Sequence, residues 1–98
     1  MNIDTRGLQA FVAIAEHGGF RKAAEALHIT QTALTRRLQN LEGSLGVRLV
    51  ERTTRAVALT LIGHDFLPQA QRMLADLESA LREIRESGKA RRGNVTIA

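Results

Sequence analysis

Four leucines spaced along residues 34–45 limit most strongly how this chain can fold. The leucines occupy positions 34, 38, 41 and 45, a spacing that places them on one buried stripe of a helix. The opposite side carries threonine, glutamine and arginine, where a solvated helix is usually richer in glutamate and lysine. The polar side chains on this face are Thr32, Arg36 and Gln39, with Thr35 beside them and Gln31 at the edge of the leucine stripe in the first turn. Because such side chains match the donor and acceptor edges of base pairs in a major groove, the segment is predicted to contact duplex DNA.

An amphipathic helix is predicted at the start of the chain. Its apolar residues follow the i, i+3, i+4, i+7 spacing, and either Asp4 or Thr5 can cap it. These apolar residues are Leu8, Phe11, Val12 and Ala15. The sequence His17-Gly18-Gly19 is predicted to end the helix, because glycine readily takes the left-handed conformation of a helix terminus.

A second helix, roughly residues 21–27, is expected to cross the leucine-bearing helix. Ala23 and Ala24 allow the close backbone approach that a tightly crossed helix pair requires. Thr30 is predicted to cap the third helix, which should end near Gly46. This pair of helices with a short connection is a helix-turn-helix.

Residues 47–59 change period and predict a short β-hairpin. Apolar residues flank a polar, basic tip at residues 51–55. The flanking residues are Val47, Leu49, Val57 and Leu59. Three helices followed by a basic hairpin form the plan of a mainly α, winged helix-turn-helix domain.

A long helix is predicted from residue 60 to about residue 87, with apolar residues repeating every three or four positions. A helix of about 27 residues spans roughly 40 Å, more than the preceding domain can bury. We therefore expect it to pair with the same helix of a second chain. The predicted dimer interface comprises Phe66, Ala70, Met73, Leu74, Leu77, Ala80, Leu81 and Ile84. Pro68 either bends this helix or indicates that it properly begins near Asp65.

Composition narrows the function further. The net charge is +4, and residues 18–55 carry seven basic and three acidic side chains, so the basic excess overlaps the helix pair and hairpin. With three Phe and no Trp or Tyr, the chain is poorly suited to stacking single-stranded bases. The absence of cysteine excludes disulfides and thiolate chemistry. Without a signal pattern or an apolar run long enough for a bilayer, a cytoplasmic location is the default.

No catalytic or metal-binding pattern is evident. His17, His28 and His64 are far apart in sequence and lack partners at ligand spacing, so we interpret them as turn or surface residues and predict no metal site. Phosphate-binding glycine loops, nucleophile elbows and paired carboxylates are also missing from the sequence. The chain is therefore predicted not to be an enzyme.

The ordered motif resembles the N-terminal DNA-binding region of LysR-type transcriptional regulators. The residues that carry the resemblance are Phe20, Ala23, Ala24, Leu27, Thr30, Gln31, Ala33, Leu34, Thr35, Leu41, Glu42, Leu45, Gly46, Leu49, Glu51, Arg52, Arg55, Leu59, Thr60 and Gly63. It implies a DNA-binding domain at 1–59, a dimerisation linker helix at 60–87, and at 88–98 a hinge with the first strand of an effector-binding domain. No cofactor is expected in these 98 residues, whereas that further domain should bind a small-molecule effector and support a tetramer.

Helix-turn-helix docking assigns roles to individual side chains. Gln31, Thr32, Thr35 and Arg36 are predicted to contact bases in the major groove. The residues predicted to contact the DNA backbone or minor groove are Arg21, Lys22, Thr30, Arg37, Arg52 and Arg55. A solvated role is nearly as compatible with Arg21 and Lys22, and Arg52 could instead pair with Glu42 or a helix end.

Departures from the family pattern affect sequence preference more than the fold. Thr32 stands where proline is common, so a side chain able to hydrogen-bond replaces a stiff first turn. Val50 stands where phenylalanine is frequent, which predicts a smaller core contact.

Two alternatives stay open from the sequence. One is another winged-helix regulator with a dimerising helix, such as a molybdate-responsive type. The other is a protein-interaction module whose long helix only assembles chains without contacting DNA.

Overall fold

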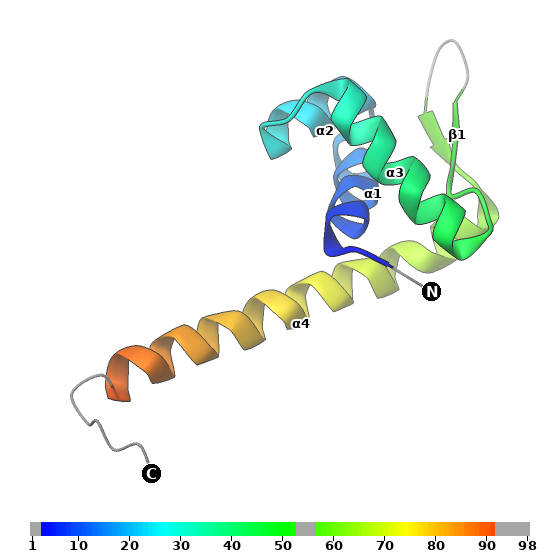
Figure 1. Cartoon of the computed structure of the whole chain (residues 1–98). Helices are drawn as coiled ribbons and strands as arrows, with labels where there is room; N and C mark the ends of the chain where they lie inside the picture. The colour runs from blue at the N-terminus through cyan, green and yellow to red at the C-terminus, as the bar shows by residue number, and fades with distance from the viewer. Residues whose placement is uncertain (1–2, 53–56, 92–98) are drawn as a thin grey trace.

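The structure is a computed structural model that describes residues 3–52 and 57–91. Figure 1 shows a compact group of three helices with a hairpin beside it and a long helix extending away from it. The elements, in chain order, are α1 (Thr5–His17), α2 (Phe20–Leu27), α3 (Gln31–Leu45), β1 (Val50–Arg52), β2 (Val57–Leu59) and α4 (Leu61–Arg91). This arrangement confirms the predicted winged helix-turn-helix followed by a long helix.

Local capping interactions fix the ends of the first three helices. The Asp4 carboxylate accepts a hydrogen bond from the backbone N–H of Arg6 at 2.8 Å, so Asp4 and not Thr5 caps α1. The Thr30 hydroxyl accepts from the backbone N–H of Ala33 at 3.0 Å and caps α3 as predicted. Gly18 and Gly46 follow α1 and α3 with φ of 73° and 74°, the left-handed conformation that glycine adopts without steric cost.

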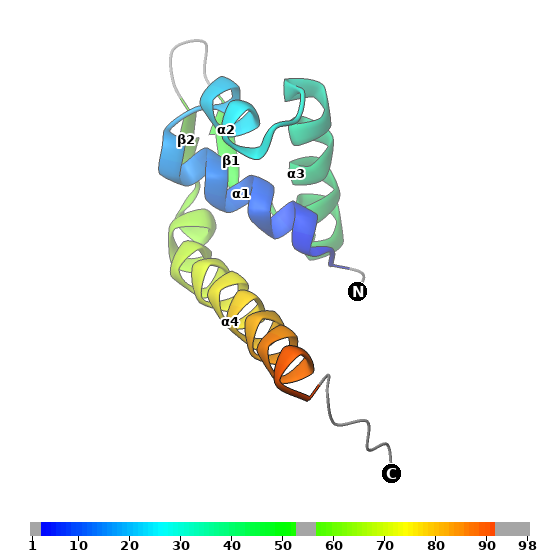
Figure 2. The ribbon, with the colours of Figure 1, turned by 90° about the vertical axis from the view of Figure 1, so that its left-hand side faces the viewer.

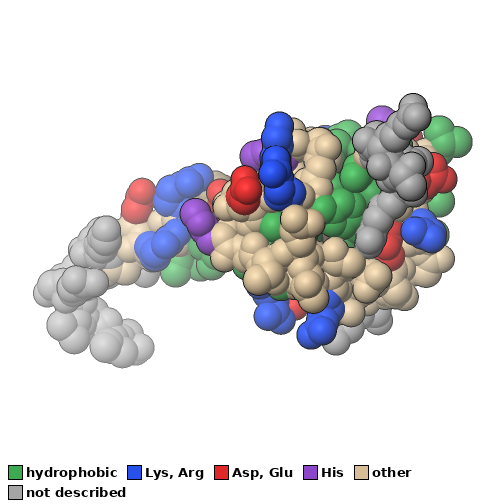
Figure 3. Space-filling view, turned by 90° about the horizontal axis from the view of Figure 1, so that it is seen from above, with side chains coloured by type: hydrophobic (Ala, Val, Ile, Leu, Met, Phe, Trp, Pro, Cys, Tyr) green, Lys and Arg blue, Asp and Glu red, His purple; other side chains and the backbone are tan. Residues whose placement is uncertain are grey.

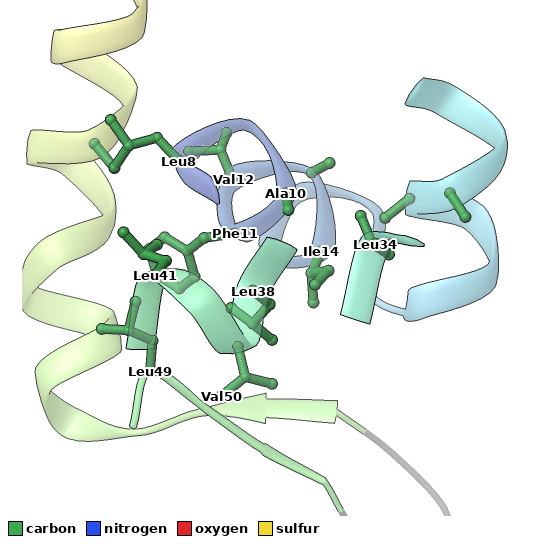
Figure 4. Packing of buried hydrophobic residues seen from close by; sticks show 14 residues of the cluster. Leu8, Ala10, Phe11, Val12, Ile14, Leu34, Leu38, Leu41, Leu49 and Val50 are labelled. Carbon is green, nitrogen blue, oxygen red and sulfur yellow. The ribbon is translucent and has the colours of Figure 1, made fainter. Parts of the chain in front are cut away.

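The core forms where α2, α3 and the first turns of α4 pack around α1 (Figure 4). Phe11 and Ile14 of α1 have no exposed surface, and Leu34, Leu38 and Leu41 of α3 are at most 2% exposed. Leu45, the last member of the predicted stripe, is only partly buried against this cluster. Burial of a leucine of this kind contributes about 1.5–3 kcal/mol to folding, so the leucine stripe is a main source of stability.

The hairpin is shorter than predicted and its strands are displaced. β1 and β2 are antiparallel, with Val50 opposite Leu59 and Arg52 opposite Val57. The sequence placed Glu51 and Arg52 in the tip, but both belong to β1. The rest of the predicted tip, residues 53–55, lies outside the described residues. Leu49, which the sequence placed on one flank of the tip, precedes β1, although it is buried together with Val50.

The long helix α4 has 31 residues, which corresponds to about 46 Å, and Figure 2 shows it leaving the domain. Its start packs against α1 through a stacked contact between the rings of Phe66 and Phe11, whose centroids are 5.8 Å apart. Gln71 Nε2 also donates to Glu16 Oε2 at 3.1 Å. Among the described residues, no helix combines the length and apolarity needed to cross a membrane.

The structure shows where α4 begins relative to Pro68. The helix begins at Leu61, so the alternative that it starts near Asp65 is wrong, and Pro68 lies inside it. Pro68 has no N–H to donate to the carbonyl of His64. Because both residues are exposed, water can hydrogen-bond that carbonyl on this side of the helix. The helix continues to Arg91, past residue 88, where the sequence predicted a hinge to begin.

Substituting Gly63 tests the close approach of α4 to the hairpin. A methyl group at Gly63 would overlap the carbonyl oxygen of Leu49, so Gly63→Ala should destabilise the domain by about 1–3 kcal/mol. Gly43→Ala is the matched control, because nothing lies within 4 Å of that position in α3. The control should stabilise the domain by about 0.5–1 kcal/mol. Urea unfolding measures both, and equal effects would contradict the predicted overlap.

Candidate nucleic-acid interface

A three-residue turn, residues 28–30, sets the angle between α2 and α3. His28 ends α2 in the left-handed conformation, with φ of 58° and ψ of 42°, and its N–H donates to the carbonyl of Glu25 at 3.1 Å. The N–H of Ile29 donates to the carbonyl of Ala24 at 3.0 Å. Within the described part of the chain, His28 alone combines a side chain with positive φ. The sequence identified a turn histidine here but gave no signal for this conformation, which glycine more often occupies.

The first turns of α3 present polar side chains to solvent. Gln31, Thr32 and Arg36 are exposed, and Thr35 is half-buried beside them. Leu34, on the opposite side of the same turns, is completely buried. The predicted base-contacting residues therefore share one exposed face on a helix that the core holds in place.

The residue that caps α3 can also form a hydrogen bond to a ligand. Thr30 is exposed, and its hydroxyl oxygen accepts the hydrogen bond from Ala33. A hydroxyl that accepts in this way keeps its hydrogen for donation, for example to a phosphate oxygen. The N–H groups in the first turn of a helix also favour anions.

Basic side chains lie at both flanks of α3. Arg21 and Lys22 are exposed in the first turn of α2, where the cap residue Gly19 supplies no side-chain hydrogen bond. On the other flank, Arg36 and Arg37 line a groove between α3 and the start of α1, together with Asp4, Arg6 and Asn40.

Charge pairing within that groove is local. Arg6 Nε and Nη2 donate to Asp4 Oδ2 at 3.0 and 2.8 Å. These hydrogen bonds hold the pKa of Asp4 below its ordinary value, and the positive charge of Arg37 acts weakly in the same direction. Arg37, predicted to contact the DNA backbone or minor groove, is half-buried and lines this groove.

The start of α3 and the far ends of the hairpin strands lie at the same end of the domain, away from α4, in both ribbon views. Figure 3 looks down on that end, where Lys and Arg side chains project around a centre made largely of uncharged side chains. The side chains of Arg52 and Arg55, predicted to extend this basic surface, lie outside the described residues. The arrangement suits a nucleic acid whose phosphates lie near the basic side chains and whose bases lie near the uncharged polar ones.

Sequence reasoning missed one hydrogen-bonded residue behind this surface. The carboxylate of Glu42, on α3, accepts hydrogen bonds from the backbone N–H groups of Leu49 and Val50. The sequence suggested only Arg52 as its partner. An acidic residue shortly before a helix-ending glycine is a weak signal, and only the fold shows which amides come within its reach.

The predicted dimer residues divide into two groups along α4. Ala70 is completely buried inside the chain, and Phe66 and Leu74 pack against the domain core. The others are exposed, with exposed fractions of 44% for Met73 and 67% for Ile84. These others are Met73, Leu77, Ala80, Leu81 and Ile84.

Comparison with known protein families gives a match over residues 5–64 to the model of the bacterial regulatory helix-turn-helix protein, lysR family. The chain is 43% identical over 98 residues to the uncharacterised HTH-type transcriptional regulator YbhD of Escherichia coli strain K12, covering all of this chain and 31% of that protein. It is 40% identical over 95 residues to the transcriptional regulator TfdT of Cupriavidus pinatubonensis, covering 97% of this chain and 42% of that protein. The chain thus spans less than half the length of these relatives, which are named as regulators and not as enzymes.

Solved structures show the same fold. Oxidised OxyR of Corynebacterium glutamicum superposes with a TM-score of 0.85 at 39% identity, covering 90% of this chain and 27% of that one. The DNA-binding domain of CbnR, solved in complex with DNA, gives a TM-score of 0.79 at 40% identity over 87% of this chain and 98% of that one. The BenM DNA-binding domain on its catB site gives 0.81 at 38% identity, over 87% and 96%.

Proposed function

The chain belongs to the LysR family of bacterial helix-turn-helix regulators, and on that basis we propose that it reads operator sequences for a dimeric transcription factor. The observation that carries the proposal is the exposed polar face at the start of α3, held rigidly by the buried leucine face behind it. Membership of this family sets aside the molybdate-responsive alternative. Two neighbours of the same fold were solved on DNA, which favours DNA over a purely protein partner.

In the proposed complex, α3 enters the major groove by its first turns. Arg36 is suited to the O6 and N7 acceptors of guanine, and Gln31 to the N6 and N7 edge of adenine. Thr32 and Thr35 offer a hydroxyl or a methyl, and the methyl can contact the methyl group of thymine. The half-buried position of Thr35 gives it the shorter reach of the two.

Backbone contacts are proposed on both sides of this helix. Thr30 would donate its hydroxyl hydrogen to a phosphate, and Arg21 and Lys22 at the start of α2 would add charge. Arg37 would reach a phosphate along the other flank, beside the groove near Asp4. Phosphate contacts of this kind supply affinity that weakens with salt but carry no sequence information directly.

The hairpin would make the remaining contacts. Arg52 and Arg55 are proposed to reach the backbone or minor groove, where narrow A·T-rich tracts attract arginine. Since their side chains lie outside the described residues, these roles rest on the resemblance. Arg52 is the last residue of β1.

Dimerisation is proposed through the projecting part of α4. Leu77, Leu81 and Ile84 are 38%, 48% and 67% exposed, which is unusual for large apolar residues on one helical face. A second copy of α4 would bury this face with coiled-coil spacing. Ala70 is excluded from the interface because it is buried inside its own chain, and Phe66 and Leu74 contribute mainly to the domain core.

Further proposals concern the domain organisation of the whole regulator. We propose the DNA-binding domain at residues 1–59 and the linker helix at 60–87, and the packing of Phe66 against Phe11 ties the start of that linker to the domain. The small-molecule effector and the tetramer concern an effector-binding domain outside these 98 residues, and they stay predictions. A DNA-binding role favours the cytoplasm of a bacterium as the location.

Substitutions should separate base reading from phosphate binding. Arg36→Ala should relax the preference at one base pair by about 1–3 kcal/mol, because a bidentate contact to guanine is lost. Arg21→Ala should weaken all duplexes similarly and reduce the salt dependence, the slope of log K against log salt, by about 1. Fluorescence anisotropy on matched duplexes over a salt series measures both quantities.

Arg72→Ala, an exposed arginine of α4, is the control for the loss of one positive charge. It should leave both the preference and the salt slope unchanged. An Arg36→Ala variant with wild-type preference at every position would contradict base reading by this residue.

A charged substitution should test the dimer. Leu77→Asp should raise the dimer dissociation constant at least about tenfold, because the new carboxylate would be buried in the interface. Ala75→Asp adds the same charge about 200° around the helix, on the opposite exposed face, and should leave association unchanged. Sedimentation equilibrium measures both, and equal dissociation constants would argue against pairing through this face.

A further inference from the structure

The backbone that leads into the hairpin is held from α3 by one carboxylate. We call residues 48–50 the wing root. Glu42 Oε2 accepts hydrogen bonds from the N–H of Leu49 at 2.7 Å and from the N–H of Val50 at 3.2 Å. Glu42 is half-buried, and hydrogen bonds to a charged acceptor are stronger than those between neutral groups. One side chain of α3 therefore binds two successive backbone N–H groups of the wing root.

The same backbone is held from α4. The Thr60 hydroxyl donates to the carbonyl of Arg48 at 2.7 Å and accepts from the N–H of Gly63 at 3.0 Å. The N–H of Thr60 donates to the carbonyl of Leu49 at 3.0 Å. Gly63 has no room for a methyl group against the Leu49 carbonyl. Residues at the start of α4 therefore contact the carbonyl groups of the wing root, whereas Glu42 binds its N–H groups.

Side-chain burial removes the remaining freedom of the wing root. Leu49 is completely buried and Val50 is 2% exposed, and Figure 4 shows both near Leu38 and Leu41 of α3. Its backbone is hydrogen-bonded on both sides and two of its three side chains are buried, so the wing root is fixed relative to both α3 and α4. A displacement of α4 relative to α3 must either carry the hairpin with it or break these hydrogen bonds.

We propose that Glu42 is a positioning residue for DNA binding, which sets the hairpin at a fixed distance from α3, and that Thr60 ties this point to α4. The proposal rests on the proposed docking of α3 and the hairpin. Duplex geometry fixes the distance between the major groove and the backbone beside it, so two contacting elements bind best when their separation is preset. Glu42 acts through the hairpin and not by touching DNA, because its carboxylate is directed to amides of its own chain.

A structural role alone would change stability without changing how the folded domain binds. The test therefore compares Glu42→Ala, Glu42→Gln and Glu25→Gln on one operator duplex over a salt series, with the active fraction titrated for each variant. Glu42→Ala should lower affinity roughly tenfold and reduce the salt slope by about 1, because contacts made through the hairpin are lost. Glu42→Gln keeps an oxygen acceptor for both amides and should retain most of the affinity.

Glu25 is exposed on α2, so Glu25→Gln controls for removing one negative charge near DNA. It should not weaken binding. Combining Glu42→Ala with Arg55→Ala tests whether Glu42 acts through the hairpin. If it does, Glu42→Ala should cause little further loss of affinity once the hairpin contact of Arg55 is removed. Full additivity of the two substitutions, or an unchanged salt slope in Glu42→Ala, would overturn the proposal.

Thr60 provides a second variant if Glu42→Ala does not fold. Thr60→Val removes the hydroxyl that binds Arg48 and Gly63 but keeps the β-branched shape, whereas Thr60→Ser keeps the hydroxyl. Thr60→Val should reduce affinity and the salt slope in the same direction as Glu42→Ala, and Thr60→Ser should not. Equal binding by the Val and Ser variants would overturn the part assigned to Thr60.

Discussion

The packing of the leucine face of α3 against α1 is the interaction on which the rest of this structure depends. It requires close contact, and Gly7 supplies it, because a Cβ there would come within 3.0 Å of Leu41 Cβ and 3.2 Å of the Arg37 carbonyl oxygen. With Leu34, Leu38 and Leu41 buried, the opposite side of α3 must face outward. The core therefore fixes the direction in which the backbone of α3 presents its polar face.

The parts of the fold with local causes could be predicted from the sequence. The apolar spacing gave the helices, and Thr30 and Gly46 gave the ends of α3, because capping depends on the nearest few residues. The strands were less predictable. Leu49 and Val50 both enter the core but only Val50 belongs to β1, so the start of the strand depends on tertiary contacts and not on apolar spacing alone.

In the candidate site, too, the features with local causes were predictable and those that depend on tertiary contacts were not. The exposure of Thr32 and Arg36 followed from helical periodicity, which placed Gln31 only at the edge of the apolar stripe. The hydrogen bonds of Glu42, in contrast, link residues seven and eight apart through a turn. The use of Ala70 in the domain core was also hidden, since its spacing fits both the chain's own core and a partner helix. In α4 one apolar pattern therefore serves two purposes. Its first turns fix the helix to α1, and its later turns stay exposed, where we propose that a second chain binds.

The central claim is that this rigidly held face reads the sequence of duplex DNA. Selection of bound molecules from a pool of randomised duplexes, repeated at two salt concentrations, tests it most directly. The account predicts enrichment of a defined motif, with an affinity that falls as salt rises because phosphate contacts release counterions. Recovery of no preferred sequence, or an affinity that does not change with salt, would contradict it.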